Sequence, residues 1–72
     1  MTRARFDVYG RYQLQIERHE NRWLVYVLGD GKRREHPNIF IPPDTAENAL
    51  TAYLEDLLHE EGAPGRMIRR IE

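Results

Sequence analysis

The chain has 72 residues, of which 40% are hydrophobic and 32% are charged, and its formal net charge is −1. This length accommodates one domain whose core is too small to enclose a deep substrate cleft. The sequence contains neither Cys nor Ser, which excludes disulfides, thiolate metal sites, and thiol or serine nucleophiles. The longest apolar run, residues 23–28, is far shorter than the roughly 20 residues of a membrane-spanning helix. We therefore expect a cytoplasmic protein that is not an enzyme, does not bind a membrane and uses no cofactor.

Apolar and polar residues alternate through residues 5–18, which is typical of a strand with one buried and one exposed face. Gly10 falls on the apolar side of this alternation, so we expect a bulge or bend there. Residues 19–22 are polar and include Asn21, which tolerates a left-handed backbone, so they are predicted to form a hairpin loop. A second strand is predicted at 23–28, where β-branched and aromatic residues are concentrated.

A turn at residues 29–32 leads to a third predicted strand at 33–41. We expect this strand to bend near Pro37, because proline cannot donate a hydrogen bond to a neighbouring strand. Pro42 and Pro43 end it. A final short segment, 66–71, is predicted to be an edge strand beside the first one, with a frayed tail as the alternative.

A helix is predicted at about residues 45–61. Asp44 and Glu47 have the spacing of a capping box, and Gly62 and Pro64 supply a stop. One face of this helix carries an apolar stripe that must pack on the sheet: Ala46, Ala49, Leu50, Tyr53, Leu54, Leu57 and Leu58. The expected fold class is therefore α+β, a three- or four-stranded, mainly antiparallel sheet in the order β-β-β-α-β, with one helix on one face.

The length of the loop at 19–22 decides which half of the second strand faces the helix. An even loop pairs Leu14 with Val27 and Ile16 with Val25, and an odd loop reverses the assignment. In either register three apolar side chains lie on the sheet face that a single helix does not cover. Two alternatives remain open for this face. Phe40, the N-terminal arm and the stems of arginines cover it, or it binds a partner or a second copy through Trp23, Leu24, Tyr26 and Leu28.

Charge is unevenly distributed along the chain. Residues 1–36 carry a net charge of +3, residues 37–65 carry −6, and residues 66–72 carry +2. The predicted strands are therefore basic and the predicted helix is acidic, although the total is close to zero.

Metal binding has weak support in the sequence. Glu55 and His59 lie one turn apart on the predicted helix, but no third ligand is evident, and His59 near a helix C-terminus also suits the helix dipole. We therefore predict no metal site.

Nucleic-acid binding is the alternative function, because basic residues alternate with aromatic ones along the predicted strands. The expected contacts are Arg22, Lys32, Arg33 and Arg34. Three segments of residues 10–61 resemble the AP2-like integrase arm-binding domains, in which three strands precede one helix: Arg22-Trp23, the residues 31–34 and the residues 45–49. Pro42-Pro43 and the acidic helix depart from that pattern.

A closer resemblance runs nearly end to end. Its motifs are residues 6–11, Arg22-Trp23, residues 31–34, Ile41-Pro42-Pro43 and residues 53–60, and they look like a family of small, stand-alone bacterial proteins of unknown function. This resemblance implies a complete single domain and assigns no activity. The function we expect is that of a small binding or interaction module, homodimeric through the uncovered sheet face.

Overall fold

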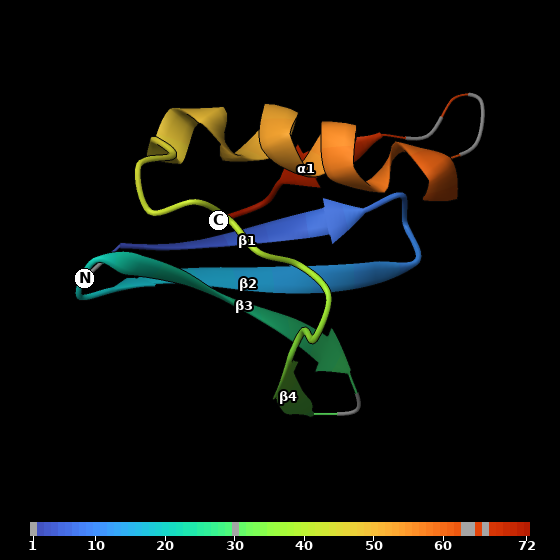
Figure 1. The fold of residues 1–72 in the computed structure, drawn as a ribbon. Helices are drawn as coiled ribbons and strands as arrows, with labels where there is room; N and C mark the ends of the chain where they lie inside the picture. Colours follow the sequence, from blue (N-terminus) through green and yellow to red (C-terminus); the bar gives the residue numbers. More distant parts are fainter. Residues whose placement is uncertain (1, 30, 63–64, 66) are drawn as a thin grey trace.

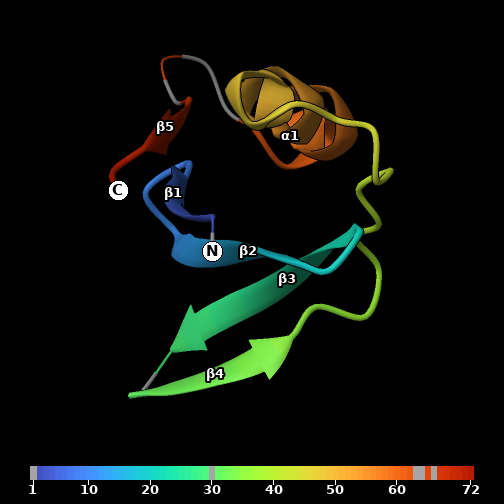
Figure 2. The same cartoon turned by 90° about the vertical axis from the view of Figure 1, so that its left-hand side faces the viewer.

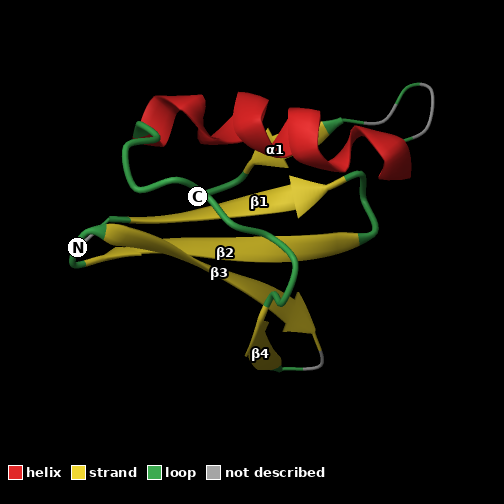
Figure 3. Cartoon of the chain, in the orientation of Figure 1, coloured by secondary structure: helices red, strands yellow, loops and turns green. Residues whose placement is uncertain are grey.

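The computed structural model describes residues 2–29, 31–62, 65 and 67–72 and shows a five-stranded antiparallel sheet with one helix on one face (Figure 1, Figure 3). The strands are β1 (Arg3–Val8), β2 (Tyr12–His19), β3 (Arg22–Gly29), β4 (Lys32–Glu35) and β5 (Ile68–Arg70), and the helix α1 spans Leu50–Leu58. Their order across the sheet is β4-β3-β2-β1-β5. The α+β class is confirmed, with one strand more than the upper end of the prediction.

The additional strand arises because residues 5–18 form a hairpin and not one bent strand. Tyr9 and Gly10 both have left-handed backbones, with φ of 56° and 70°. The Gly10 amide donates a hydrogen bond to the Asp7 carboxylate (3.1 Å), and Val8 lies opposite Tyr12. The predicted bend at Gly10 was right in position but wrong in kind, because two consecutive left-handed residues reverse the chain whereas a bulge only kinks it.

The β2–β3 hairpin has the even loop. His19 lies opposite Arg22, so residues 20 and 21 alone form the turn. The left-handed residue is Glu20 (φ 58°) and not Asn21, which corrects the expectation from the sequence. The register pairs Leu14 with Val27 and Ile16 with Val25, so alternate residues of β3 point to opposite faces. Those on the helix side are Trp23, Val25 and Val27, and those on the other side are Leu24, Tyr26 and Leu28.

The predicted strand 33–41 ends early, because β4 stops at Glu35. The His36 amide still donates to the Val25 carbonyl (2.8 Å), but Pro37 follows and has no amide hydrogen to continue the pairing. Residues 39–41 instead run over the helix side, where Ile39 and Ile41 are buried. Phe40, between them, is 70% exposed. The expectation that Phe40 covers the opposite sheet face is therefore wrong.

The helical segment lies close to its predicted place. A 3-10 turn, η1 (Glu47–Ala49), precedes α1, and a second one, η2 (His59–Glu61), follows it. The capping box does not form: the residue before η1 is Ala46, and Glu47 pairs with Arg70 of β5 (2.6 Å). The Thr45 amide donates a hydrogen bond to the Pro42 carbonyl (3.0 Å) and closes a turn there. The helical segment therefore begins further along the chain, at Glu47, where Asp44 cannot cap it. Gly62 follows η2, and Pro64 lies outside the described residues.

The predicted C-terminal edge strand is confirmed as β5, although it is shorter than 66–71 and residue 66 lies outside the described part of the chain. β5 pairs antiparallel with β1, placing Ile68 opposite Val8. β4 and β5 form the two edges of the sheet, with α1 connecting them over one face (Figure 2).

The core lies between α1 and the sheet. Leu50, Leu54 and Leu58, each one turn apart, are buried, whereas Leu57 is 43% exposed, so the apolar stripe that reaches the core is narrower than predicted. The sheet and the loop before the helix contribute the remaining buried residues: Ala4, Phe6, Val8, Tyr9, Leu14, Ile16, Trp23, Val25, Ile39, Ile41 and Ile68.

Two tyrosines tie this layer together. The hydroxyl of Tyr9 donates to the carbonyl of Leu58 at the end of α1 (3.1 Å), and the hydroxyl of Tyr53 donates to the carbonyl of Phe40 (2.6 Å). The Leu58 carbonyl lies at the end of a helix and the Phe40 carbonyl lies in a loop. Each thus accepts a hydrogen bond from a side chain of another part of the fold.

Replacing Leu54 tests this arrangement. Leu54→Ala removes a fully buried side chain and should lower the free energy of unfolding by about 2–5 kcal/mol. Leu57→Ala makes the same chemical change one turn away on the exposed flank and should cost less than about 1 kcal/mol. Urea unfolding followed by circular dichroism measures both. Equal losses would contradict the packing of α1 on the sheet.

Candidate interaction surface

The sheet face opposite α1 is a surface that the helix leaves uncovered. In Figure 1 and Figure 2, α1 and the loop before it lie on one side of the sheet, and no helix of the described residues lies on the other. We call this side the exposed sheet face. By the observed pairing it carries Arg3, Arg5, Asp7, Gln13, Gln15, Glu17, His19, Arg22, Leu24, Tyr26, Leu28, Arg33, Glu35 and Arg69.

An apolar row runs along β3 in this face. Leu24, Tyr26 and Leu28 occupy alternate positions of the strand, and all three are half-buried. No second layer of secondary structure covers this face. The half-burial of these three side chains therefore means that long side chains from neighbouring strands lie over them.

Arg33 is one of these neighbours. It belongs to β4, and its guanidinium lies over the ring of Tyr26 on β3, 4.3 Å from the ring centroid. It extends further and forms an ion pair with Glu17 on β2, with 2.7 Å between Arg33 Nη1 and Glu17 Oε2. Arg33 therefore crosses the apolar row, as expected if arginine stems cover this face.

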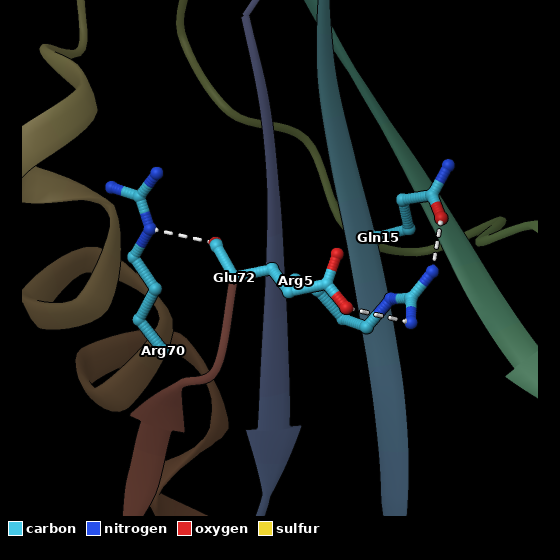
Figure 4. A network of polar contacts seen from close by, with 4 residues as sticks. All are labelled: Arg5, Gln15, Arg70 and Glu72. Atoms are coloured by element: carbon cyan, nitrogen blue, oxygen red, sulfur yellow. Dashed lines mark hydrogen bonds and ion pairs between the residues drawn. The ribbon is translucent and has the colours of Figure 1, made fainter.

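The polar contacts continue from Glu17 to the opposite edge of the sheet. Gln15 donates to Glu17 (2.5 Å) and accepts from Arg5 (3.3 Å), and Arg5 is ion-paired with Glu72 (3.1 Å). Figure 4 shows Arg5 between Gln15 and Glu72, and also Arg70, whose Nε donates to the Glu72 carbonyl. These side chains link β4, β2, β1 and the segment after β5 into one network across the exposed sheet face.

The network sets the charge state of Glu17. Partial burial alone would raise the pKa of this carboxyl. Hydrogen bonds donated by Gln15 and Arg33, together with the positive charges of Arg33 and Arg3, outweigh burial and lower the pKa of Glu17 below its ordinary value. Glu17 is consequently ionised at neutral pH and suits a fixed charge better than a proton carrier.

The predicted partner surface is only partly assembled. Leu24, Tyr26 and Leu28 share the exposed sheet face, but Trp23 is buried on the helix side. Its indole Nε1 donates to the Thr45 carbonyl (3.0 Å), and the guanidinium of Arg18 lies over its ring, 5.0 Å from the centroid. Including Trp23 was wrong because adjacent residues of a strand point to opposite faces.

The four predicted nucleic-acid contacts are divided between the two faces. Arg22 and Arg33 lie on the exposed sheet face, but at opposite ends of β3, about 20 Å apart along the strand. Lys32 and Arg34 lie opposite Gly29 and Val27, on the helix side.

No three side chains of the His, Cys, Asp or Glu types gather to hold a metal ion within the described part of the chain. The ring of His59 lies against the backbone, with Nδ1 2.7 Å from the Asp56 carbonyl oxygen. No helix in the described residues is long and apolar enough to cross a membrane.

Sequence reasoning missed Arg5, Gln15, Glu17 and Glu72 as members of the site. The alternation of β2 placed Gln15 and Glu17 on the correct face but gave no signal for their partners. Glu72 and Arg5 are 67 positions apart, and only the pairing of β1 with the segment after β5 brings them together.

A family model described as "Domain of unknown function (DUF7661)" matches residues 3–72, and the chain belongs to this family. This agrees with the end-to-end resemblance to small proteins of unknown function. The likeness to AP2-like integrase arm-binding domains is not shown. No curated protein and no solved structure is significantly similar to the chain.

The ion pair predicts how Glu17 titrates. Arg33→Gln removes one hydrogen bond and one positive charge from Glu17, so the pKa of Glu17 should rise towards its ordinary value. Arg34→Gln removes the same charge from the next residue, which faces the other side, and should leave this pKa unchanged. Carboxyl NMR titration of both variants makes the comparison. Identical titration of Glu17 in the two variants would contradict the pairing.

The same pair predicts a pH-dependent stability. The pKa of Glu17 is lower in the folded than in the unfolded chain, so its contribution is fully present above the unfolded value and is lost as pH falls through the folded value. The difference in unfolding free energy between the native chain and Arg33→Gln should therefore be largest near neutral pH and shrink in acid. Urea unfolding at several pH values measures this difference. A difference that does not change with pH would assign it to the stacking of Arg33 on Tyr26 alone.

Proposed function

We propose that this protein is a small non-catalytic binding module and that the exposed sheet face binds a second copy of the same chain. The observation that carries the proposal is the row of Leu24, Tyr26 and Leu28, which remains half-exposed although Arg33 lies over part of it. Removing such a row from water is the usual driving force of protein association.

Charge complementarity favours a second copy as the occupant. On the exposed sheet face, Glu17 lies on β2 and Arg33 lies on β4, on either side of the apolar row of β3. A two-fold axis parallel to β3 sets the two β3 rows against each other and places β2 of each copy opposite β4 of its partner. Within one chain the Arg33 side chain extends along the face to the level of Glu17, and this axis brings the partner's Arg33 guanidinium to the same level, so the pairing made within one chain can also be made between two.

The edges of the sheet are poor alternatives to its face. β4 has four residues and β5 has three, and each carries at least two cations. Short, highly charged edge strands are unfavourable templates for adding a further strand. Association is therefore expected through side chains of the face and not through backbone pairing at an edge.

The size of the molecule is compatible with such an interface. A standard interface buries on the order of 800 Å² on each partner. The accessible surface of the chain is 5135 Å², so a standard interface uses about a sixth of it. One sheet face packed on another at about 10 Å would supply this contact.

The non-catalytic part of the proposal rests on the chemistry available. The chain lacks Ser and Cys nucleophiles. Glu17 has its pKa lowered, which moves it away from the near-neutral value that suits a general acid or base. Nucleic-acid binding remains the alternative, but its four expected contacts do not share one face, because Lys32 and Arg34 lie on the helix side and Arg22 and Arg33 lie on the exposed sheet face.

A charge placed in the apolar row tests the proposal. The native chain should show a molar mass that rises towards that of a dimer with concentration in sedimentation equilibrium. Leu28→Glu should hold it at the mass of the monomer, because the new carboxylate would be buried against its own copy. Within one chain we expect the substitution to be tolerated, since the cross-strand neighbours of Leu28 are Gln13 and Arg33.

Phe40→Glu is the matched control. It places the same charge on a residue that is 70% exposed on the other side of the sheet, so its mass should follow that of the native chain. A native chain that stays monomeric at millimolar concentration, or equal dissociation in the two variants, would reject the exposed sheet face as a dimer interface.

A further inference from the structure

A second surface feature lies on the helix side of the sheet, at the free end of the β3–β4 hairpin. Val27, Gly29, Lys32 and Arg34 line an open hollow of about 460 Å³, which we call the hairpin hollow. Its volume is within the usual range of small-molecule sites. Figure 1 and Figure 2 show this hairpin projecting away from α1, so the helix does not cover it.

The register explains how the hollow is lined. Gly29 lies opposite Lys32, and Val27 lies opposite Arg34, so all four residues belong to the same face of the sheet. Lys32 and Arg34 are two positions apart on one strand, which separates their Cα atoms by about 7 Å. Both side chains are exposed, and neither forms an ion pair or a hydrogen bond with the described residues. One oxyanion can therefore be reached by both cationic groups.

Gly29 keeps the hollow open. A Cβ built on Gly29 meets nothing within 4 Å, and its backbone is not left-handed, so no steric or conformational constraint requires glycine there. Gly31 of the same hairpin differs, because its φ is 74°. The missing side chain of Gly29 leaves a gap beside the apolar Val27, and this gap is next to the two cations.

We infer that the hairpin hollow binds a small organic oxyanion, a phosphate or carboxylate group attached to a compact apolar body. Lys32 and Arg34 hold the oxyanion by charge-assisted hydrogen bonds, and the apolar body lies over Gly29 against Val27. The hollow is on the face opposite the proposed dimer surface, so this inference does not rest on the proposed function.

The test is an NMR titration of the full chain with phenyl phosphate, benzoate and inorganic phosphate. The aromatic anions should produce saturable shifts of the Val27, Gly29 and Arg34 amides at lower concentration than inorganic phosphate. Tighter binding of phenyl phosphate than of benzoate assigns the natural oxyanion to the phosphates, and the reverse order assigns it to the carboxylates; either order supports the site.

Four substitutions distinguish a specific binding site from general electrostatic attraction. Lys32→Gln and Arg34→Gln should each weaken binding of phenyl phosphate about tenfold, whereas Arg33→Gln, which removes a neighbouring charge on the other face, should change it little. Gly29→Val fills the gap without changing charge, so it should abolish the advantage of phenyl phosphate over inorganic phosphate while inorganic phosphate still binds.

Two results would overturn the inference. Chemical shift changes that do not saturate, or binding that weakens equally in Arg33→Gln and Arg34→Gln, would show that the anions are held only by general electrostatic attraction. Binding of a single-stranded oligonucleotide that is much tighter than that of phenyl phosphate and steeply salt-dependent would replace the small-ligand site by a nucleic-acid contact.

Discussion

The fold depends on one apolar contact, in which Leu50, Leu54 and Leu58 of α1 pack on alternate residues of the sheet. A chain of 72 residues has material for a single interface between two layers, so everything outside this contact is surface. One helix is narrower than five strands. The far face of the sheet and the projecting β3–β4 hairpin therefore remain open, and these are the two regions to which we assign binding.

Long polar side chains take the place of a second layer on the exposed sheet face. Arg33 lies over Tyr26 and reaches Glu17, and Arg5 extends to Gln15 and Glu72. The apolar parts of these arginines shield the sheet while their guanidinium groups bind carboxylate and amide oxygens. Such a cover can be exchanged. A partner that offers its own carboxylate and apolar row replaces the internal contacts of Arg33 with equivalent external ones, at a small net cost in electrostatic energy.

The sequence predicted what depends on local periodicity. The alternation of β2 and the apolar stripe of the helix follow periods of two and 3.6 residues and were predicted from them, whereas β3 was predicted from its β-branched and aromatic residues with its register left open. The β1–β2 hairpin was missed because the left-handed conformation of Tyr9 leaves no trace in polarity. The capping box failed because Glu47 pairs with Arg70, a contact that only the position of β5 creates.

The candidate site was less predictable than the fold. Alternation along β3 places Leu24, Tyr26 and Leu28 on one face, but it does not say which face. Trp23 could be excluded from the exposed sheet face only once the length of the β2–β3 loop was known. The Arg33–Glu17 pair could not be predicted from the spacing of the two residues in the sequence. They belong to strands separated by β3, and the shape of the sheet brings their side chains together. Pairs of this kind are tertiary in origin.

The two-residue turn at positions 20 and 21 restricts how this chain can change length. Inserting or deleting a single residue there would exchange the two faces of β3, moving Trp23 and Val25 into water and Tyr26 into the core, unless a bulge absorbed the change. Lengthening by two residues preserves the parity and with it both faces. Related chains that keep this architecture should therefore vary in this turn by even steps, although the turn itself is exposed and touches neither proposed binding region.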